Sequence, residues 1–196
     1  MFDENWRSII GYPQYWVSDK GRVMNARRAH VLRDITGRDP NYDAVTLYKN
    51  GQKRYFNVHN LVTGSFLGPC PEGYEVDHKD RNGHNNCLSN LRYVDKSKNA
   101  RNKFLSRKNK SGLRGVHKDR NRWRTKLTHK GKTVMQCYCN SKREAARMYI
   151  NALAEIDEED AANAQAEYDA YESDDERTMP GGHPTESEDE DISGSM

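Results

Sequence analysis

Residues 75–102 read EVDHKDRNGHNNCLSNLRYVDKSKNARN, and the fold predicted for the chain follows mainly from this segment. It places a carboxylate beside an imidazole, Asp77 and His78, and then adds two carboxamides, Asn90 and Asn99. These separations fit a strand, a loop, a second strand and a short helix. The residue types are those of a one-metal site that cuts phosphodiester bonds, so the stretch predicts a nuclease.

Such a site needs a cation that stabilises charge on the phosphate and a base that activates water. Asp77 offers a carboxylate oxygen and Asn99 an amide oxygen, and both suit one Mg²⁺ or Mn²⁺ ion. His78 is the expected base because imidazole titrates near neutral pH. Neighbouring residues on a strand point to opposite faces, so Asp77 and His78 can act together only if the strand is bent or the substrate runs along its edge.

The charge of the chain is divided between a basic body and an acidic tail. Residues 1–155 carry 31 Lys and Arg against 14 Asp and Glu, a net charge of +17, whereas residues 156–196 carry one Arg against 15 acidic residues, −14. A basic body favours a polyanion such as double-stranded DNA as the partner. The tail is expected to be solvated, and a further hypothesis is that it folds back on the body and weakens non-specific DNA binding.

Length and composition exclude several other classes. With 196 residues and 34% hydrophobic content, the chain has room for one or two domains with modest cores. It has no apolar run near the ~20 residues of a membrane span and no secretory pattern at its start. No membrane partner or small-molecule substrate is expected. The four cysteines are not spaced as in a disulfide framework: Cys70, Cys87, Cys137 and Cys139. We therefore expect free thiols and a cytoplasmic, intracellular location.

The first 57 residues are predicted to form a small β-rich module. Asp19-Lys20-Gly21 is a turn sequence between two strands, and Asn50-Gly51 separates two alternating runs, which is the strongest short-range signal for a hairpin. The nuclease core is assigned to residues 58–104. It begins with VHNLVTGSFL, residues 58–67, whose apolar residues recur at helical spacing.

A second compact domain is expected after a basic linker at residues 105–111. Residues 112–156 predict three short strands and a helix, and alternation on the second strand sends Arg122, Arg124 and Lys126 to one face. A capping box of Ser141 and Glu144 begins the helix. Its core-facing side is predicted to hold Ala145, Tyr149, Ala152 and Ile156.

The acidic tail, residues 157–196, is predicted to be disordered. It has almost no large apolar residue after Tyr171, so it cannot bury enough surface to offset the entropy lost on ordering. Residues 157–172 alone could extend the preceding helix.

The central stretch resembles the ββα-metal site of phage HNH homing endonucleases, in the variant that ends in Asn. This resemblance implies that Asp77 and Asn99 bind one metal ion, that His78 is the general base and that Asn90 orients His78. His84 and Asn86, in the loop between, are weaker candidates. Residues 5–23 are similar to a small module found at the N-terminus of many such nucleases, and residues 58–67 resemble the helix that precedes their active site.

Residues 112–155 resemble the plant ethylene-response-factor (AP2/ERF-like) type of DNA-binding domain, which lays a three-stranded sheet in the major groove. Cys137 stands where this family usually has Gly, and Cys139 where it has an aromatic residue. The expected DNA-binding residues combine the basic linker with the sheet: Arg101, Lys103, Arg107, Lys108, Lys110, Arg114, His117, Arg122, Arg124 and Lys126.

The sequence therefore predicts an α+β protein: a β-rich N-terminal module, an HNH core, and a C-terminal three-stranded antiparallel sheet with a helix. The predicted activity is metal-dependent hydrolysis of DNA to 5′-phosphate and 3′-hydroxyl ends. One alternative is a DNA-binding regulator without catalysis, and another is a nuclease that acts on RNA. His59 is expected to pack or cap. A zinc site made by His78, His84 and Cys87 is disfavoured, because a second tight pair of ligands is missing.

Overall fold

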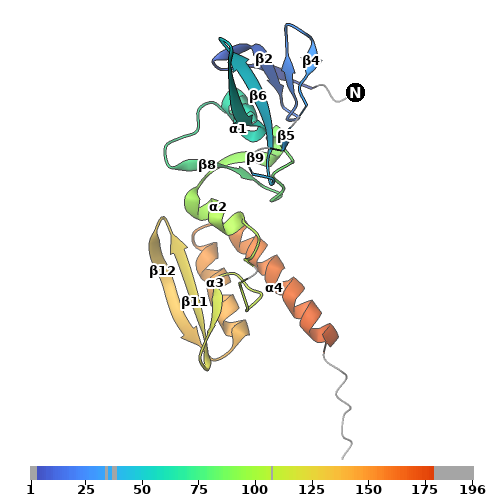
Figure 1. Cartoon of the computed structure of the whole chain (residues 1–196). Coiled ribbons are helices and arrows are strands. Elements are labelled where there is room, and N and C mark those ends of the chain that lie inside the picture. The colour runs from blue at the N-terminus through green and yellow to red at the C-terminus, as the bar shows by residue number, and fades with distance from the viewer. Residues whose placement is uncertain (1–3, 34, 37–38, 107, 179–196) are drawn as a thin grey trace, which may run out of the picture. The chain divides into compact units, whose positions relative to one another are not determined.

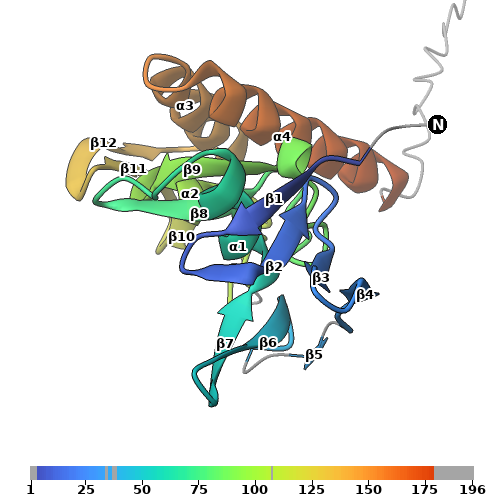
Figure 2. The ribbon, with the colours of Figure 1, turned by 90° about the horizontal axis from the view of Figure 1, so that it is seen from above.

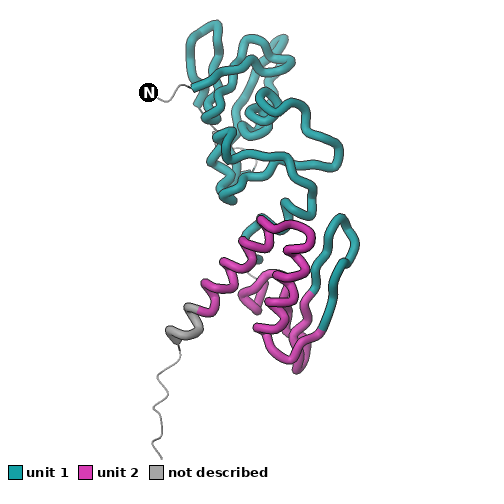
Figure 3. The backbone as a smooth tube through the Cα atoms, turned by 180° about the vertical axis from the view of Figure 1, so that it is seen from behind, with its two compact units in different colours: residues 1–108, 126–137 teal, residues 109–125, 138–196 magenta. Residues whose placement is uncertain are grey.

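The computed structural model describes residues 4–33, 35–36, 39–106 and 108–178. The chain divides into two compact units, residues 1–108 with 126–137, and residues 109–125 with 138–196 (Figures 1 and 3). The described residues form four small sheets and four α-helices, a mixed α/β architecture. None of these helices has the length and apolar character needed to span a bilayer.

The first sheet is an antiparallel meander in which the strands follow their order in the sequence. The predicted turn at residues 19–21 connects its second and third strands, and Gly21 there has a φ of +81°. That backbone conformation favours glycine because it has no Cβ. The strands are β1 (Trp6–Ile9), β2 (Tyr12–Ser18), β3 (Val23–Asn25) and β4 (His30–Val31).

The second sheet contains the predicted hairpin. Strand β6 pairs antiparallel with β7, and Lys49 lies opposite Gln52. Asn50 and Gly51 between them both have positive φ, +51° and +76°, as a two-residue hairpin turn with primed geometry requires. The hairpin prediction is confirmed. The strands are β5 (Ile35–Thr36), β6 (Asp43–Lys49) and β7 (Gln52–Asn57).

Helix α1 (Val58–Phe66) confirms the helix predicted from the apolar spacing of residues 58–67. It contacts strands β1, β2, β6 and β7 (Figure 2). Val58 and Val62 are fully buried and Phe66 packs at the edge of the same core, which also contains Leu91. The residues before and after position 58 therefore share one core. Helix α1 also contacts the two strands that follow it in the sequence.

A two-stranded sheet and a short helix follow α1, in the predicted order. They are β8 (Tyr74–His78), the 3-10 helix η1 (Leu88–Asn90), β9 (Leu91–Asp95) and α2 (Lys96–Asn102). Strand β8 pairs antiparallel with β9, and Asp77 lies opposite Arg92. The Asp95 carboxylate accepts hydrogen bonds from the backbone N–H groups of Ser97 and Lys98, which is why α2 begins there.

The fourth sheet comprises β10 (Val116–Asp119), β11 (Arg122–His129) and β12 (Lys132–Cys139). Strand β10 pairs antiparallel with β11, and His117 lies opposite Arg124. Thr125 and Leu127 are fully buried while Lys126 between them is exposed, so the strand has one buried face and one solvent face, as the alternation predicts.

Helix α3 (Lys142–Ala154) starts with the predicted cap: Ser141 Oγ accepts from the Glu144 N–H at 3.1 Å. Its packing on β10 requires Gly115, since a Cβ there would lie 2.2 Å from the ring of Tyr149. Ala145 and Tyr149 are buried as predicted, but the buried stripe continues through Leu153. Ala152 is only partly buried and Ile156 lies beyond the helix, so the prediction placed this end of the stripe incorrectly.

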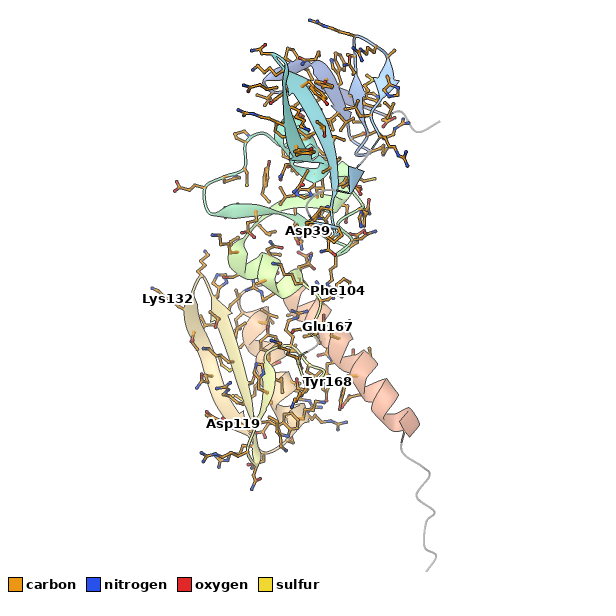
Figure 4. The ribbon with its side chains drawn as sticks, viewed as in Figure 1. Asp39, Phe104, Asp119, Lys132, Glu167 and Tyr168 are labelled. Carbon is orange, nitrogen blue, oxygen red and sulfur yellow. The ribbon has the colours of Figure 1, made fainter. Side chains whose placement is uncertain are left out.

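Residues 158–178 form helix α4 (Glu158–Thr178), so the helix anticipated for residues 157–172 exists as a separate element, and the prediction of disorder is wrong for residues 173–178. Helix α4 contacts α3, and its buried apolar residues, spaced along one face, are Ala161, Ala164 and Tyr168, of which Tyr168 is labelled in Figure 4. Asp157 caps the helix by accepting from the Asp160 N–H, and acidic residues in the first turn favour the helix dipole. Residues 179–196 lie outside the described part of the chain.

Candidate active site

A cavity of about 370 Å³ opens between β8, the loop after it and the end of α2. Asp77, His78 and Asn99 all line it, together with Asn102. Asp39 and Phe104, labelled in Figure 4, line it as well. Asp77 and His78 are adjacent in the strand yet line the same cavity, because His78 is the last residue of β8 and the chain turns away immediately after it.

Asp77 is held on both carboxylate oxygens. It is 4% exposed. Oδ1 accepts a hydrogen bond of 2.8 Å from Asn102 Nδ2, and Oδ2 accepts one of 2.8 Å from Nε of Arg92, the residue opposite on β9. A carboxylate oxygen can accept more than one bond, so both oxygens keep capacity for a cation. The two contacts fix the carboxylate in one orientation.

His78 sits in a cluster of rings. The His59 ring packs edge-on against it with a centroid distance of 5.1 Å, and Tyr42 lies 5.8 Å from it. Burial lowers the pKa of His78 below 6.5, opposed by a hydrogen bond with Asn86 and by nearby carboxylates. The imidazole is thus favoured in the neutral form that can accept a proton.

Asn86 has a fixed amide orientation. Its Nδ2 donates to Asp43 Oδ2 at 2.9 Å, so its Oδ1 faces His78 Nε2 at the long distance of 3.5 Å. An oxygen at that position favours the tautomer with hydrogen on Nε2, in which Nδ1 carries no hydrogen. The loop is pressed onto the N-terminal module here, since a Cβ on Gly21 would lie 2.6 Å from the Cβ of Asn86.

Asn90 has different partners from those expected. Its Nδ2 donates to Asp80 Oδ1 at 2.9 Å and to the Asn85 carbonyl at 2.8 Å, while its Oδ1 accepts from the Asp80 N–H. The side chain that bonds the His78 ring is Asn86, named from the sequence only as a weaker candidate. Asn90 therefore closes the loop that carries Asn86, and its side chain bonds Asp80 and Asn85 instead of the His78 ring.

Asn99 lines the cavity from α2, and its Nδ2 donates to Glu75 Oε2 at 2.6 Å. The other weaker candidate, His84, is half-exposed, and its Nδ1 lies 2.7 Å from Asp43 Oδ1. His59 is buried and packs, as predicted.

The sequence did not reveal several side chains that contact the predicted site residues. Asp43 and Tyr42 belong to the N-terminal module, more than thirty residues before Asp77 in the sequence. Asn102 follows Asn99 by three residues on one helix, a spacing that puts both on one face and was a usable signal. The missed side chains are Tyr42, Asp43, Glu75, Arg92 and Asn102.

The donor set fits a hard divalent cation. The cavity is lined by Asp77, which carries a carboxylate, and by Asn99, which carries an amide oxygen, and it is large enough for water and phosphate oxygens, which would complete the coordination shell. Within the described residues, no cluster of three or more His, Cys, Asp and Glu side chains could hold a metal ion. The four cysteines are free thiols.

The predicted DNA-binding residues differ in exposure. Arg101 is buried in α2, and Arg114 is paired with Glu167 of α4 at 3.2 Å. Arg124 is partly buried, and Arg107 lies outside the described residues. The remaining predicted residues are exposed: Lys103, Lys108, Lys110, His117, Arg122 and Lys126.

Comparison with known proteins adds family information to this geometry. The DNA endonuclease I-HmuI of Bacillus phage SP01 is 37% identical over 100 residues, which cover 50% of this chain and 57% of that protein. The H-N-H endonuclease F-TflII of Escherichia phage T5 is 36% identical over 90 residues, 45% of this chain and 46% of that protein. The chain thus spans about half the length of the curated relatives it matches.

A solved structure of the HNH homing endonuclease I-HmuI, described by its DNA binding and cleavage, matches with a TM-score of 0.47 and 37% identity, covering 50% of this chain and 56% of that one. Two family models match adjacent segments. Residues 4–57 match the NUMOD4 motif, and residues 56–101, which contain Asp77, His78, Asn90 and Asn99, match the HNH endonuclease model.

Proposed function

We propose that this protein is a metal-dependent DNA endonuclease of the HNH homing type, which hydrolyses phosphodiester bonds to 5′-phosphate and 3′-hydroxyl ends. The observation that carries the proposal is that Asp77, His78 and Asn99 line one cavity, with Asp77 and His78 both buried. The match of residues 56–101 to the HNH endonuclease model supports it.

His78 acts as the general base. Asn86 Oδ1 holds the Nε2 hydrogen, and Nδ1 takes a proton from the water that attacks the phosphate. The edge-on contact with His59 keeps the His78 ring in place. Asp77 and Asn99 would hold one Mg²⁺ or Mn²⁺ ion, which when bound supplies positive charge next to the phosphate and the leaving 3′ oxygen.

DNA is the proposed partner, and the basic residues outside the cavity are proposed to bind it. The solvent face of β10 and β11 carries His117, Arg122 and Lys126, and exposed lysines precede the sheet. The order of three strands followed by a helix supports an ethylene-response-factor type of DNA-binding domain over residues 112–156. Contacts from such residues to phosphates would make the affinity fall steeply with salt.

The test is cleavage of supercoiled plasmid DNA with Mg²⁺ or Mn²⁺. His78→Ala should lower the rate ~10²- to 10⁴-fold, the usual range for a general base. His30→Ala removes an exposed histidine of β4 and should retain activity. If wild type binds DNA and cuts no plasmid, the protein is a regulator without catalysis. A parallel assay on RNA of the same sequence tests the remaining alternative, and faster RNA cleavage would contradict DNA as the substrate.

A further inference from the structure

Glu75 contacts the proposed ligand Asn99 from outside the active-site cavity. Asn99 lines this cavity and also a second one of about 540 Å³, whereas Glu75 lines only the second. The Glu75 carboxylate accepts a hydrogen bond of 2.6 Å from Asn99 Nδ2. Both side chains are partly buried, which limits competition from water.

The chemistry of this contact fixes the orientation of the amide. An ionised carboxylate only accepts hydrogen bonds, while an Asn side chain has one donating end and one accepting end. Glu75 can therefore bind only the nitrogen end of Asn99. The oxygen end, which is the end that a hard divalent cation binds, is left for the active-site cavity.

Asn102 shows why this selection matters. It lies one turn after Asn99 on α2 and also lines the active-site cavity. Its Nδ2 donates to Asp77 Oδ1 and to the His78 carbonyl, and its Oδ1 accepts from Arg81 Nε at 3.3 Å. Both ends of the Asn102 amide are thus engaged within the protein, whereas the contact with Glu75 engages only the nitrogen end of Asn99.

We propose that Glu75 is a positioning residue that holds the Asn99 amide with its oxygen toward the metal. This inference deepens the proposed function and rests on it. Glu75 and Asp77 are two residues apart on β8, so one strand supplies both the carboxylate that would bind the cation and the carboxylate that orients the second ligand.

The test measures Mn²⁺ affinity of the full chain by electron paramagnetic resonance, without DNA. Glu75→Gln replaces a pure acceptor by an amide that can bind either end of Asn99. It should weaken Mn²⁺ binding ~10-fold or more, the usual loss for a residue that orients a metal ligand. The control is Glu72→Gln, which removes the same charge from an exposed residue that also precedes Asp77 in the sequence. This variant should leave the Mn²⁺ affinity unchanged.

A second background separates orientation from charge. In Asn99→Asp the two oxygens are equivalent, so no orientation remains to be selected, and adding Glu75→Gln should not weaken Mn²⁺ binding. An equal loss in both backgrounds, or no loss with Asn99 present, overturns the role of Glu75. The Asp77→Ala variant reports on the metal site itself. If Asp77→Ala loses Mn²⁺ binding while Glu75→Gln retains it, only the role of Glu75 fails. If the wild type binds no Mn²⁺, the proposed metal site fails together with the role of Glu75.

Discussion

Asn102 Nδ2 donates to Asp77 Oδ1 at 2.8 Å, and the same nitrogen donates to the backbone carbonyl of His78 at 2.8 Å. One amide on α2 thus joins the end of β8 at two adjacent residues. Both Asn102 and Asp77 are buried, so neither side chain can readily exchange its partner for water. This contact ties the helix to the strand at the position where the predicted ligand and the predicted base meet.

Replacing Asn102 by Ala should reduce both stability and cleavage. Loss of the amide leaves the buried Asp77 oxygen and the His78 carbonyl each without one donor, at a cost of about 1–3 kcal/mol. Thermal unfolding and plasmid cleavage at saturating Mg²⁺ are the measurements. Asn151→Ala, at an exposed position of α3, is the control. Equal melting temperatures for the two variants would contradict a structural role for the Asn102 contacts.

The pH dependence of cleavage should report the lowered pKa of His78. Burial disfavours the charged imidazole, so the base stays deprotonated below the ordinary value of 6.5. The rate, measured as kcat/KM, should rise with pH through a midpoint below 6.5. The Asn86 hydrogen bond raises the pKa of His78, so Asn86→Ala should move this midpoint further toward acid. A wild-type midpoint at or above 6.5 would disagree with the buried environment.

His59 should make the protein sensitive to acid. Burial lowers its pKa from 6.5 to about 4, so in this window the unfolded chain binds a proton that the folded chain does not. Above pH 6.5 His59 is neutral in both states and costs no stability. As pH falls from 6.5 toward 4, protonation of the unfolded chain lowers the free energy of unfolding by at most about 3 kcal/mol. Urea unfolding across this range tests it. His59→Phe, which keeps a ring but cannot titrate, should flatten the dependence, and an unchanged slope would exclude His59 as its source.

Helix α4 should contribute to the stability of the C-terminal unit. Ala164 is buried against α3, while Ala162 is exposed on the same helix. Ala164→Asp places a carboxylate in an apolar contact and should destabilise by ~2 kcal/mol or more, whereas Ala162→Asp should change stability by less than ~0.5 kcal/mol. Chemical unfolding of the full chain compares them. Indistinguishable variants would mean that α4 does not pack on α3 in solution.

Local sequence determined the elements of this protein because their signals lie within a few residues. The Asn50-Gly51 turn requires positive φ at two positions, and the apolar spacing of residues 58–67 fits one face of one helix. The alternation around Thr125 gave the buried face of β11 in the same way. The motif around Asp77 and His78 predicted the chemistry, because a carboxylate, an imidazole and an amide are the ligand and base types that a one-metal hydrolytic site requires.

Tertiary structure decided the contacts between those elements. Nothing in the spacing of Asn86 and Asn90 shows which amide bonds His78, because that depends on how Asp43 and Gly21, more than forty residues earlier in the chain, hold the loop. Acidic composition likewise predicted a disordered tail in which residues 157–172 could at most extend the preceding helix, but packing of α4 on α3, with Ala161, Ala164 and Tyr168 buried, offsets the ordering entropy of a separate helix. Composition describes a segment alone, whereas the stability of a helix depends on the surface against which it packs.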